Sequence, residues 1–520
     1  MLPAMQRRTL LMSSAAALAP LSTVAASRPL TERSATELAA DLASGRVSAQ
    51  ALLAACMQRI EAVDRKGPRI NSIIELNPDA RAQAKALDAE RLAGKLRGPL
   101  HGLPVLLKDN IATGDRMQTT AGSLALSGLH APRDAHFVQR LRAAGALILG
   151  KTNLSEWANM RSTRSTSGWS GRGGLTRNPY ALDRNCSGSS SGSGAAIAAE
   201  LAPLAVGSET DGSIVSPSSI CGIVGLKPTL GRVSRDGIIP ISHSQDTAGP
   251  MARSVADCAL LYAAMCGRDA NDPITADAPA QPDWTPQPLK GRRLGVARNY
   301  FTGYDEADDV IENAIRRLRE LGAEIVDPID LAPVSYGDAE SQVLLYEFKV
   351  DLAQWLKTFA PGHSAQNLAD LIAFNKAHAG EEMPWFAQEL FEKAQALGGL
   401  DTPAYLDALK QSKDGARANG LDRAFDAHQL DAIIAPTGSP AWLTDPIASD
   451  HYGASFSTPA AVAGYPHLTV PAGLVRGLPM GLSFVGRAWS ENLLLSLGHA
   501  FERGTMARQR PRFTANTRLL

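Results

Sequence analysis

The sequence contains few cysteines, and they follow no metal-binding or disulfide pattern. Its 520 residues include five cysteines, with no Cys-x-x-Cys pair and no His/Cys cluster at zinc-site spacing. Structural zinc sites and disulfide-stabilised scaffolds both need several such residues at short, regular intervals. We therefore expect no metal and no disulfide framework in this chain. The cysteines are Cys56, Cys186, Cys221, Cys258 and Cys266.

The sequence also lacks an excess of charge of either sign. Lysine and arginine together number 52, as do aspartate and glutamate, so the formal net charge is zero. Proteins that bind nucleic acid or an anionic membrane surface usually carry a basic field. We therefore expect no nucleic-acid partner. With 44% apolar and 20% charged residues, the composition is typical of a soluble globular protein with a large core.

Long hydrophobic runs are missing as well. No stretch approaches the roughly 20 apolar residues that a membrane-spanning helix needs, so we expect no integral membrane segment in the mature chain. The N-terminus has the layout of an export signal: the basic pair Arg7 and Arg8, a short apolar run, and small residues. The arginine pair followed by Thr-Leu-Leu resembles a twin-arginine signal. We predict a signal peptide over residues 1–26, cleaved near Ala26, and a periplasmic or secreted protein; a disordered cytosolic leader is the alternative.

What the sequence does contain, after the leader, is an alternation of helical and strand patterns. Residues 34–64 have apolar residues at helical spacing, broken once at Gly45. The segment GLPVLLKDN, residues 102–110, contains a buried strand that ends in Lys108. Such alternation predicts an α/β fold. We find no internal repeat and predict one large domain over residues 28–520, with a mostly helical insertion or cover near residues 339–425.

Two segments match the residue pattern of a catalytic or nucleotide-binding motif but not the secondary structure that the motif requires. Residues 145–152, GALILGKT, match the phosphate-binding pattern G-x-x-x-x-G-K-T, but the four intervening residues are typical of a strand and not of a loop. Residues 188–192, GSSSG, match the nucleophile elbow around Ser190, but the elbow requires a strand immediately before it. The preceding segment is polar and rich in turns. We therefore predict neither a nucleotide site nor an elbow, and no cofactor.

Two turns rich in serine and glycine are the stronger candidates for chemistry. Residues 185–194, NCSGSSSGSG, precede a strongly helix-forming segment, so they begin a helix and do not link two domains. Ser213 lies in a second such turn, directly after a short strand. Lys108 ends another buried strand, and a desolvated lysine with a lowered pKa is a competent base. The less specific interpretations remain open: a serine turn is often only a helix cap, and Lys108 can extend to solvent or pair with Asp109.

At the level of motifs, the sequence resembles the amidase signature family. Residues 186–229 contain a Ser/Gly-rich block, then ETDGSIVSP, then CGIVGLKPT, similar to the family's G-G-S-S-G-G-S, T-D-x-G-G-S-I-R-x-P and C-G-x-x-G-L-K-P-T. The flanks HGLPVLLKDNI, GKTNLSEWA and PMGLSFVG also agree. The resemblance extends over nearly all of the chain after the leader. It implies a central mixed β-sheet covered by helices on both faces.

The resemblance also implies a catalytic apparatus of two serines and a lysine. The family's lysine corresponds to Lys108, its bridging serine, which follows a cis peptide bond, to Ser189, and its nucleophile to Ser213. Neutral Lys108 would take a proton through Ser189 as Ser213 attacks an amide carbon, and water would hydrolyse the acyl-enzyme. Backbone N–H groups of residues 210–213, which include Thr210, Asp211 and Gly212, would form the oxyanion hole.

Two departures from the family pattern affect this expectation. Asp211 stands where the family usually has the first glycine before the nucleophile, and Ser187 replaces the first glycine of the Ser/Gly block. A carboxylate beside the oxyanion would alter the local field.

The segments ETDGSIVSP, LSEWANMRS, SGWSGRGG and TRNPY are similar to those of the peptide amidase branch, which hydrolyses the C-terminal carboxamide of peptides. The alternatives are an amidase for aryl, fatty or aliphatic amides, a catalytically silent amidase-like binding module, and one subunit of an amidotransferase. The sequence does not indicate the oligomeric state.

Overall fold

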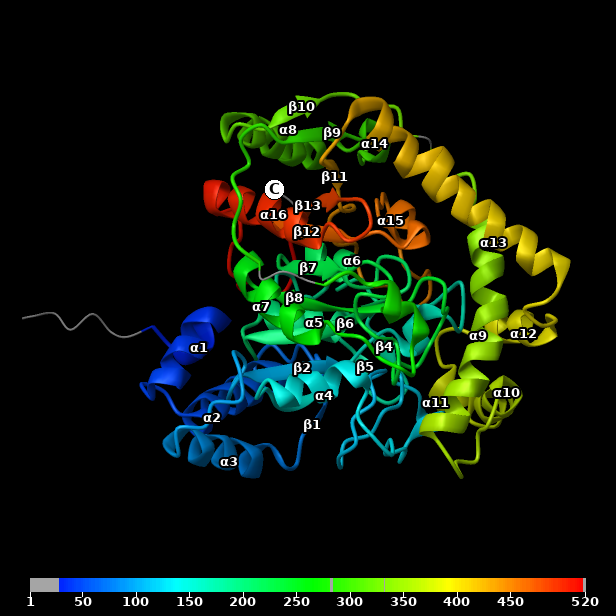
Figure 1. The fold of residues 1–520 in the computed structure, drawn as a ribbon. Coiled ribbons are helices and arrows are strands. Elements are labelled where there is room, and N and C mark those ends of the chain that lie inside the picture. The colour runs from blue at the N-terminus through cyan, green and yellow to red at the C-terminus, as the bar shows by residue number, and fades with distance from the viewer. Residues whose placement is uncertain (1–27, 281–283, 332, 518–520) are drawn as a thin grey trace, which may run out of the picture.

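The computed structural model describes residues 28–280, 284–331 and 333–517. The predicted signal peptide therefore lies outside the described residues. An 11-stranded sheet crosses the whole molecule (Figure 1), in the order β1-β3-β2-β6-β8-β7-β12-β13-β11-β9-β10. The strands are β1 (Ile73–Leu76), β2 (Pro104–Lys108), β3 (Leu147–Thr152), β6 (Leu204–Glu209), β7 (Val224–Lys227), β8 (Thr247–Ala252), β9 (Arg293–Val296), β10 (Glu324–Val326), β11 (Ala432–Pro436), β12 (His467–Val475) and β13 (Leu478–Val485), and a separate pair comprises β4 (Trp169–Ser170) and β5 (Gly174–Leu175).

The sheet is mixed. Its parallel pairs are β3 with β2, β2 with β6, β11 with β9, and β9 with β10, and the remaining neighbours are antiparallel. Most strands are buried along their whole length, which explains their near-continuous apolar sequences. The mixed sheet flanked by helices confirms the predicted fold class.

Helices pack on the sheet and along one side of it. They are α1 (Ala35–Ser44), α2 (Ala49–Arg59), α3 (Ala80–Leu92), α4 (His136–Ala143), α5 (Ser191–Ala198), α6 (Val215–Ile220), α7 (Val255–Met265), α8 (Asp305–Glu320), α9 (Gly337–Phe359), α10 (Leu368–Ala377), α11 (Ala379–Glu382), α12 (Glu389–Ala396), α13 (Pro403–Ala416), α14 (Asp422–His428), α15 (Thr458–Ala463) and α16 (Glu491–Thr505). Figure 1 shows α9 to α13 together on one side of the sheet, in yellow-green to gold.

Local sequence explains several of these boundaries. Ser34 begins α1 with a capping box that includes Glu37, and Gly45 ends it with a φ of +74°, which glycine adopts without the steric cost of a side chain. Residues 147–152 of the GALILGKT segment form β3, so the rejection of a phosphate-binding loop is confirmed.

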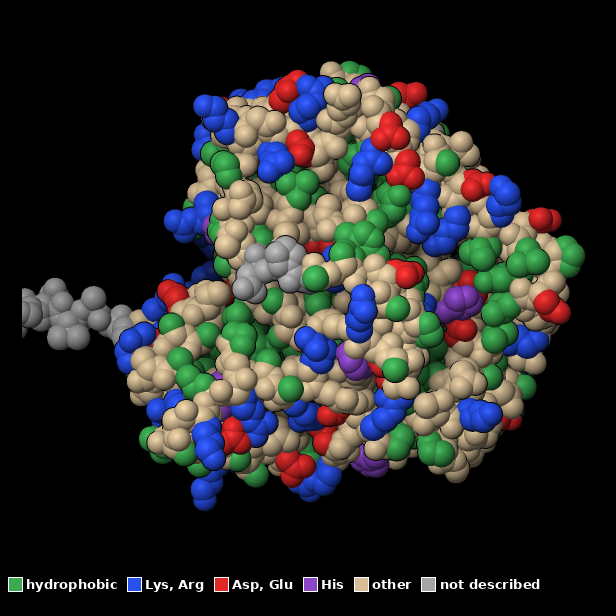
Figure 2. Space-filling view, viewed as in Figure 1, with side chains coloured by type: hydrophobic (Ala, Val, Ile, Leu, Met, Phe, Trp, Pro, Cys, Tyr) green, Lys and Arg blue, Asp and Glu red, His purple; other side chains and the backbone are tan. Residues whose placement is uncertain are grey.

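The surface agrees with the balanced composition. On the face seen in Figure 2, Lys and Arg side chains are interspersed with Asp and Glu. In the described part of the chain, no helix is long and apolar enough to cross a membrane.

Candidate active site

Lys108 and the Ser213 turn lie at the same edge of the sheet. Strands β2 and β6 are parallel neighbours, with Val105 opposite Leu204. Their carboxyl ends therefore meet at one edge, as the ends of parallel strands do. Lys108 is the last residue of β2, and Ser213 follows β6 by four residues.

Lys108 is fully buried and hydrogen-bonded to two serines. Its Nζ lies 2.7 Å from Ser189 Oγ, 3.0 Å from Ser208 Oγ and 3.1 Å from the Ser208 carbonyl oxygen. Burial lowers the pKa of Lys108 to about 7, against the opposing effect of the Asp246 and Glu209 carboxylates. A large part of the lysine is therefore neutral near pH 7 and has a lone pair available to accept a proton.

The Ser/Gly turn places Ser189 beside the lysine. The peptide bond between Gly188 and Ser189 is cis, and the Ser155 amide donates a hydrogen bond to the Ser189 carbonyl at 3.1 Å. A Cβ atom on Gly188 would lie well inside contact distance of Ser155 Oγ, so a larger residue here would force the Ser155 side chain or the turn to move. Helix α5 begins at Ser191, and the nearest preceding strand, β5, ends at Leu175, so no strand leads directly into the turn and the rejection of an elbow at Ser190 is confirmed.

Ser213 begins the turn into α6 and contacts the Ser/Gly turn. The Ser190 amide donates to the Ser213 carbonyl at 3.2 Å. The Glu209 carboxylate accepts hydrogen bonds from the amides of Ile214 (2.7 Å) and Val215 (3.0 Å), which fixes the backbone on the other side of the serine. Ser213 is 8% exposed, whereas Lys108 is fully enclosed. Within the described residues, no hydrogen bond joins the Ser213 and Ser189 hydroxyls directly.

The predicted oxyanion loop has free backbone donors. In the part of the chain that the structure describes, the N–H groups of Asp211, Gly212 and Ser213 donate to no protein acceptor. Gly212 has a φ of +78°, a conformation that residues with a Cβ rarely adopt. The Thr210 hydroxyl donates to the Asp246 carboxylate, which holds the start of the loop against the segment before β8. The loop can therefore direct several donors at one bound oxygen.

Three polar side chains of the site were not predicted from the sequence. Ser208 accepts from both Lys108 and Asn110, whose Nδ2 lies 2.9 Å from Ser208 Oγ. Glu209 holds the backbone after Ser213. A signal was present, because Ser208 and Glu209 are polar residues at the end of an otherwise apolar strand.

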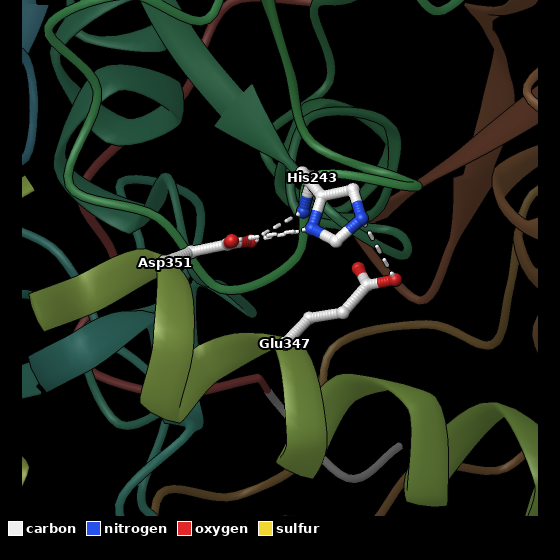
Figure 3. Close-up of side chains that lie close together, drawn as sticks. All are labelled: His243, Glu347 and Asp351. Atoms are coloured by element: carbon white, nitrogen blue, oxygen red, sulfur yellow. Dashed lines mark hydrogen bonds and ion pairs between the residues drawn. The ribbon is translucent and has the colours of Figure 1, made fainter. Parts of the chain in front are cut away.

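A separate group of residues of metal-ligating type lies between α9 and the segment before β8 (Figure 3). His243 Nδ1 is 2.9 Å from Asp351 Oδ2, and its Nε2 is 3.4 Å from Glu347 Oε1. Both ring nitrogens thus face carboxylates, the arrangement of a charged imidazolium that is hydrogen-bonded to Asp351 and ion-paired with Glu347. We interpret this group as an ion pair that joins the two elements.

Comparison with known proteins shows which family the chain belongs to. The family model described as Amidase matches residues 51–495. The chain belongs to the amidase family. A probable amidase of Arabidopsis thaliana is 39% identical over 472 residues, which cover 88% of this chain and 87% of the relative. A glutamyl-tRNA(Gln) amidotransferase subunit of Halorhodospira halophila is 35% identical over 501 residues, with 91% and 97% coverage.

Several solved structures are similar to this amidase over almost its whole length. The native peptide amidase of Stenotrophomonas maltophilia is 51% identical with a TM-score of 0.89, covering 93% of this chain and 99% of that one. The peptide amidase in complex with the competitive inhibitor chymostatin is 50% identical with a TM-score of 0.90, covering 93% and 100%. An amidase family protein of Bacillus anthracis is 34% identical with a TM-score of 0.84, covering 93% of each chain. The predicted family and fold are confirmed, and the protein is an amidase, a hydrolase.

Proposed function

We propose that this amidase removes the C-terminal carboxamide group of peptides, with Ser213 as nucleophile, Ser189 as proton relay and Lys108 as general base. The observation that carries the proposal is the 2.7 Å contact between buried Lys108 and Ser189, next to the partly accessible Ser213 turn. A serine becomes a nucleophile only when a positioned base takes its proton, and a neutral lysine can be that base. Among the described residues, no histidine is hydrogen-bonded to either serine to take this role.

Acylation transfers one proton from Ser213 to the lysine. As Ser213 Oγ bonds to the carboxamide carbon, its proton moves to Ser189 Oγ, and the Ser189 proton moves to Lys108 Nζ. The negative charge that develops on the carboxamide oxygen is stabilised by N–H groups of residues 210–213. When the C–N bond breaks, Lys108 returns the proton through Ser189 to the nitrogen, and ammonia leaves.

Deacylation repeats the sequence with water. Lys108 and Ser189 take a proton from the water as its oxygen bonds to the acyl carbon. The ester bond to Ser213 then breaks, and the proton returns to Ser213 Oγ. The products are a peptide with a free C-terminal carboxyl group and one molecule of ammonia, and the enzyme is unchanged.

The proposed peptide substrate is supported by the degree of similarity to peptide amidase. Identity of about 50% across 93% of the chain exceeds the 35% found with the amidotransferase relative. The amidotransferase relatives make one component of such a complex the second candidate function. Aryl, fatty and small aliphatic amides remain the alternative substrate classes for the same serine chemistry.

Export is part of the proposal. The basic pair and small-residue boundary of residues 1–26 support a signal peptide, and a periplasmic or secreted enzyme would meet peptide substrates outside the cytoplasm. Fractionation of cells that express the full chain, with N-terminal sequencing of the product, tests this. A mature N-terminus near residue 27 in the periplasm or medium is expected, and full-length protein in the cytoplasm would contradict export.

A substrate panel tests the function. Purified protein is incubated with an amidated dipeptide, the same peptide as a free acid, an anilide and a short aliphatic amide, and the products are measured as ammonia and by mass spectrometry. We expect the amidated peptide to lose one carboxamide, its internal peptide bond to stay intact, and Ser213→Ala to abolish the reaction. Preference for the anilide or the aliphatic amide would replace the proposed substrate class. A Ser213→Ala variant as active as wild type would remove the nucleophile assignment.

A further inference from the structure

Asp211, the residue that departs from the family pattern, forms a carboxyl pair with Glu340 of the cover helix α9. The two side chains are within hydrogen-bond distance of each other. Asp211 Oδ2 also accepts a hydrogen bond from the Thr458 hydroxyl at 2.6 Å. Asp211 Oδ1 is buried and takes no hydrogen bond of ordinary geometry from a described N–H or hydroxyl donor.

Both members of the pair are connected to the oxyanion loop, Asp211 directly and Glu340 through Gln245. Asp211 is itself a residue of that loop. On the other side, Gln245 Nε2 donates to Glu340 Oε1 at 2.9 Å and to the Thr210 carbonyl at 3.3 Å. The position of the N–H groups before Ser213 therefore depends on contacts that α9 makes through Glu340.

Two carboxyl groups can hydrogen-bond to each other only if one of them holds a proton. Burial raises the pKa of Glu340 to about 8, and the neighbouring Asp211 charge contributes to the rise. Burial also raises the pKa of Asp211, but the neighbouring Ser457 and Thr458 hydroxyls and the charge of Lys227 favour its ionised form. The shared proton thus resides mainly on Glu340, and the pair carries one negative charge at neutral pH.

Several charged groups face the pair from the surrounding elements. Two lysines offset its negative charge, and each has a pKa lowered by burial to about 8. The Glu209 carboxyl and the neutral hydroxyl of Tyr336 also face the pair. These groups are Lys227 on β7, Lys413 on α13, Glu209 on β6 and Tyr336 at the start of α9.

We propose that Asp211 and Glu340 act as a proton-sharing positioning pair, which keeps the oxyanion loop in place while one proton is shared and releases it when that proton is lost. This inference rests on the proposed serine chemistry but not on the identity of the amide. Loss of the proton leaves two carboxylates in contact within a buried site, and their repulsion separates them. The second negative charge also lies beside the oxygen that must become negative in the transition state.

The pair adds an alkaline limit to activity, opposite to the limit set by Lys108. The lysine must be neutral to accept a proton, so activity rises with pH through about 7. Glu340 must be protonated, so activity falls again as pH rises through about 8. Together the two groups predict a bell-shaped profile with a narrow maximum between these values.

The test compares pH profiles of kcat/KM from pH 5.5 to 10 for wild type and Glu340→Gln, because kcat/KM reports the pKa values of the free enzyme. Glutamine retains a donor toward Asp211 and an acceptor for Gln245, but it cannot ionise. We expect Glu340→Gln to lose the alkaline limb or to shift it upward by at least one pH unit, while its acid limb stays in place. An unchanged alkaline limb would overturn the inference and would assign that limb to another group, such as Lys227 or Lys413.

Two further variants complete the experiment. Asp211→Asn also prevents the pair from carrying two charges, so its alkaline limb is expected to disappear even if its maximal rate is lower. Glu347→Gln is the matched control, because Glu347 lies two turns along the same helix and is hydrogen-bonded to Ser242, Ser244 and Tyr405 instead. Its alkaline limb is expected to match that of wild type, and loss of the limb there would count against the pair.

A failure of the Asp211–Glu340 inference can be distinguished from a failure of the proposed peptide substrate. The profiles are measured with whichever substrate of the panel the wild type hydrolyses fastest. If no amide is hydrolysed, the profile of Ser213 labelling by a serine-directed phosphonate replaces the rate. In that case an alkaline limb that Glu340→Gln removes would support the pair even though the peptide amide proposal has failed.

Discussion

Lys108 Nζ lies 2.7 Å from Ser189 Oγ inside the protein, and this contact joins two segments that are 81 residues apart in the sequence. Neither group is unusual alone. The lysine ends a strand, and the serine belongs to a turn before a helix. Burial makes the lysine a base by disfavouring its charged form, and the contact places that base beside a serine hydroxyl.

The first prediction concerns the lysine. Lys108→Ala removes the proton acceptor, and we expect kcat/KM to fall by about 10²–10⁴-fold, the usual contribution of a positioned base. In wild type, kcat/KM should decline as pH falls through about 7, because protonated Lys108 cannot act as a base. Initial rates from pH 5 to 9 measure both effects. A flat acid side in wild type would contradict a neutral-lysine base.

The second prediction separates neighbouring serines. Ser189→Ala removes the hydroxyl between Lys108 and Ser213, and we expect a loss of about 10²–10⁴-fold in kcat. Ser190→Ala removes only a hydrogen bond from Ser190 Oγ to the Ser208 carbonyl and a weaker one from the Ser208 amide, so its turnover should stay well above that of Ser189→Ala. Equal losses, or a larger loss in Ser190→Ala, would contradict the assignment of the relay to Ser189.

The third prediction concerns the backbone of the Ser/Gly turn. Gly188→Ala places a Cβ against Ser155 Oγ, and we expect destabilisation of about 1–3 kcal/mol, typical of overpacking in a rigid interior. Because the turn carries Ser189, turnover should fall as well. Urea unfolding and initial rates measure the two effects. The double variant Gly188→Ala with Ser155→Ala should recover part of the stability, and no recovery would show that the conflict lies elsewhere.

The fourth prediction concerns the ion pair of Figure 3. Burial alone would lower the pKa of His243, but the hydrogen bond with Asp351 and the charges of Asp351 and Glu347 raise it overall. A histidine with a raised pKa in the folded state stabilises that state fully below the unfolded pKa of about 6.5. The stabilisation is lost as pH rises through the folded value. The Tm difference between wild type and His243→Asn should therefore be largest in mild acid and shrink with rising pH, and a constant difference would contradict it.

The parts of the fold and of the site that the sequence predicted are those that depend on local pattern. In the fold, Gly45 separates α1 from α2. In the site, the apolar run before Lys108 identifies a strand that ends in a lysine. The roles of Ser189 and Ser213 are implied by the motif resemblance. The Ser/Gly turn alone matches a nucleophile elbow centred on Ser190. The geometry puts Ser189 next to the lysine.

The contacts made by helix α9 could not be predicted in this way. Nothing near Glu340 in the sequence indicates that it meets Asp211, because their contact depends on how α9 packs against the sheet edge. Glu209 is similar: its carboxylate is buried and holds the backbone after Ser213, a role that depends on the turn folding back over the strand. Burial and tertiary position decide what these acidic side chains do, and neither follows from residue type or spacing.

The assignment of Ser213 as nucleophile is tested most directly by finding which residue reacts with a serine-directed reagent. Purified protein is treated with a serine-directed phosphonate, with and without a saturating amidated dipeptide, and the modified residue is located by peptide mapping. We predict a single adduct on Ser213, slower labelling when the peptide amide is present, and no labelling of Ser213→Ala. An adduct on Ser190 or Ser189, or no adduct on a protein that is otherwise folded, would contradict the assignment of Ser213 as nucleophile.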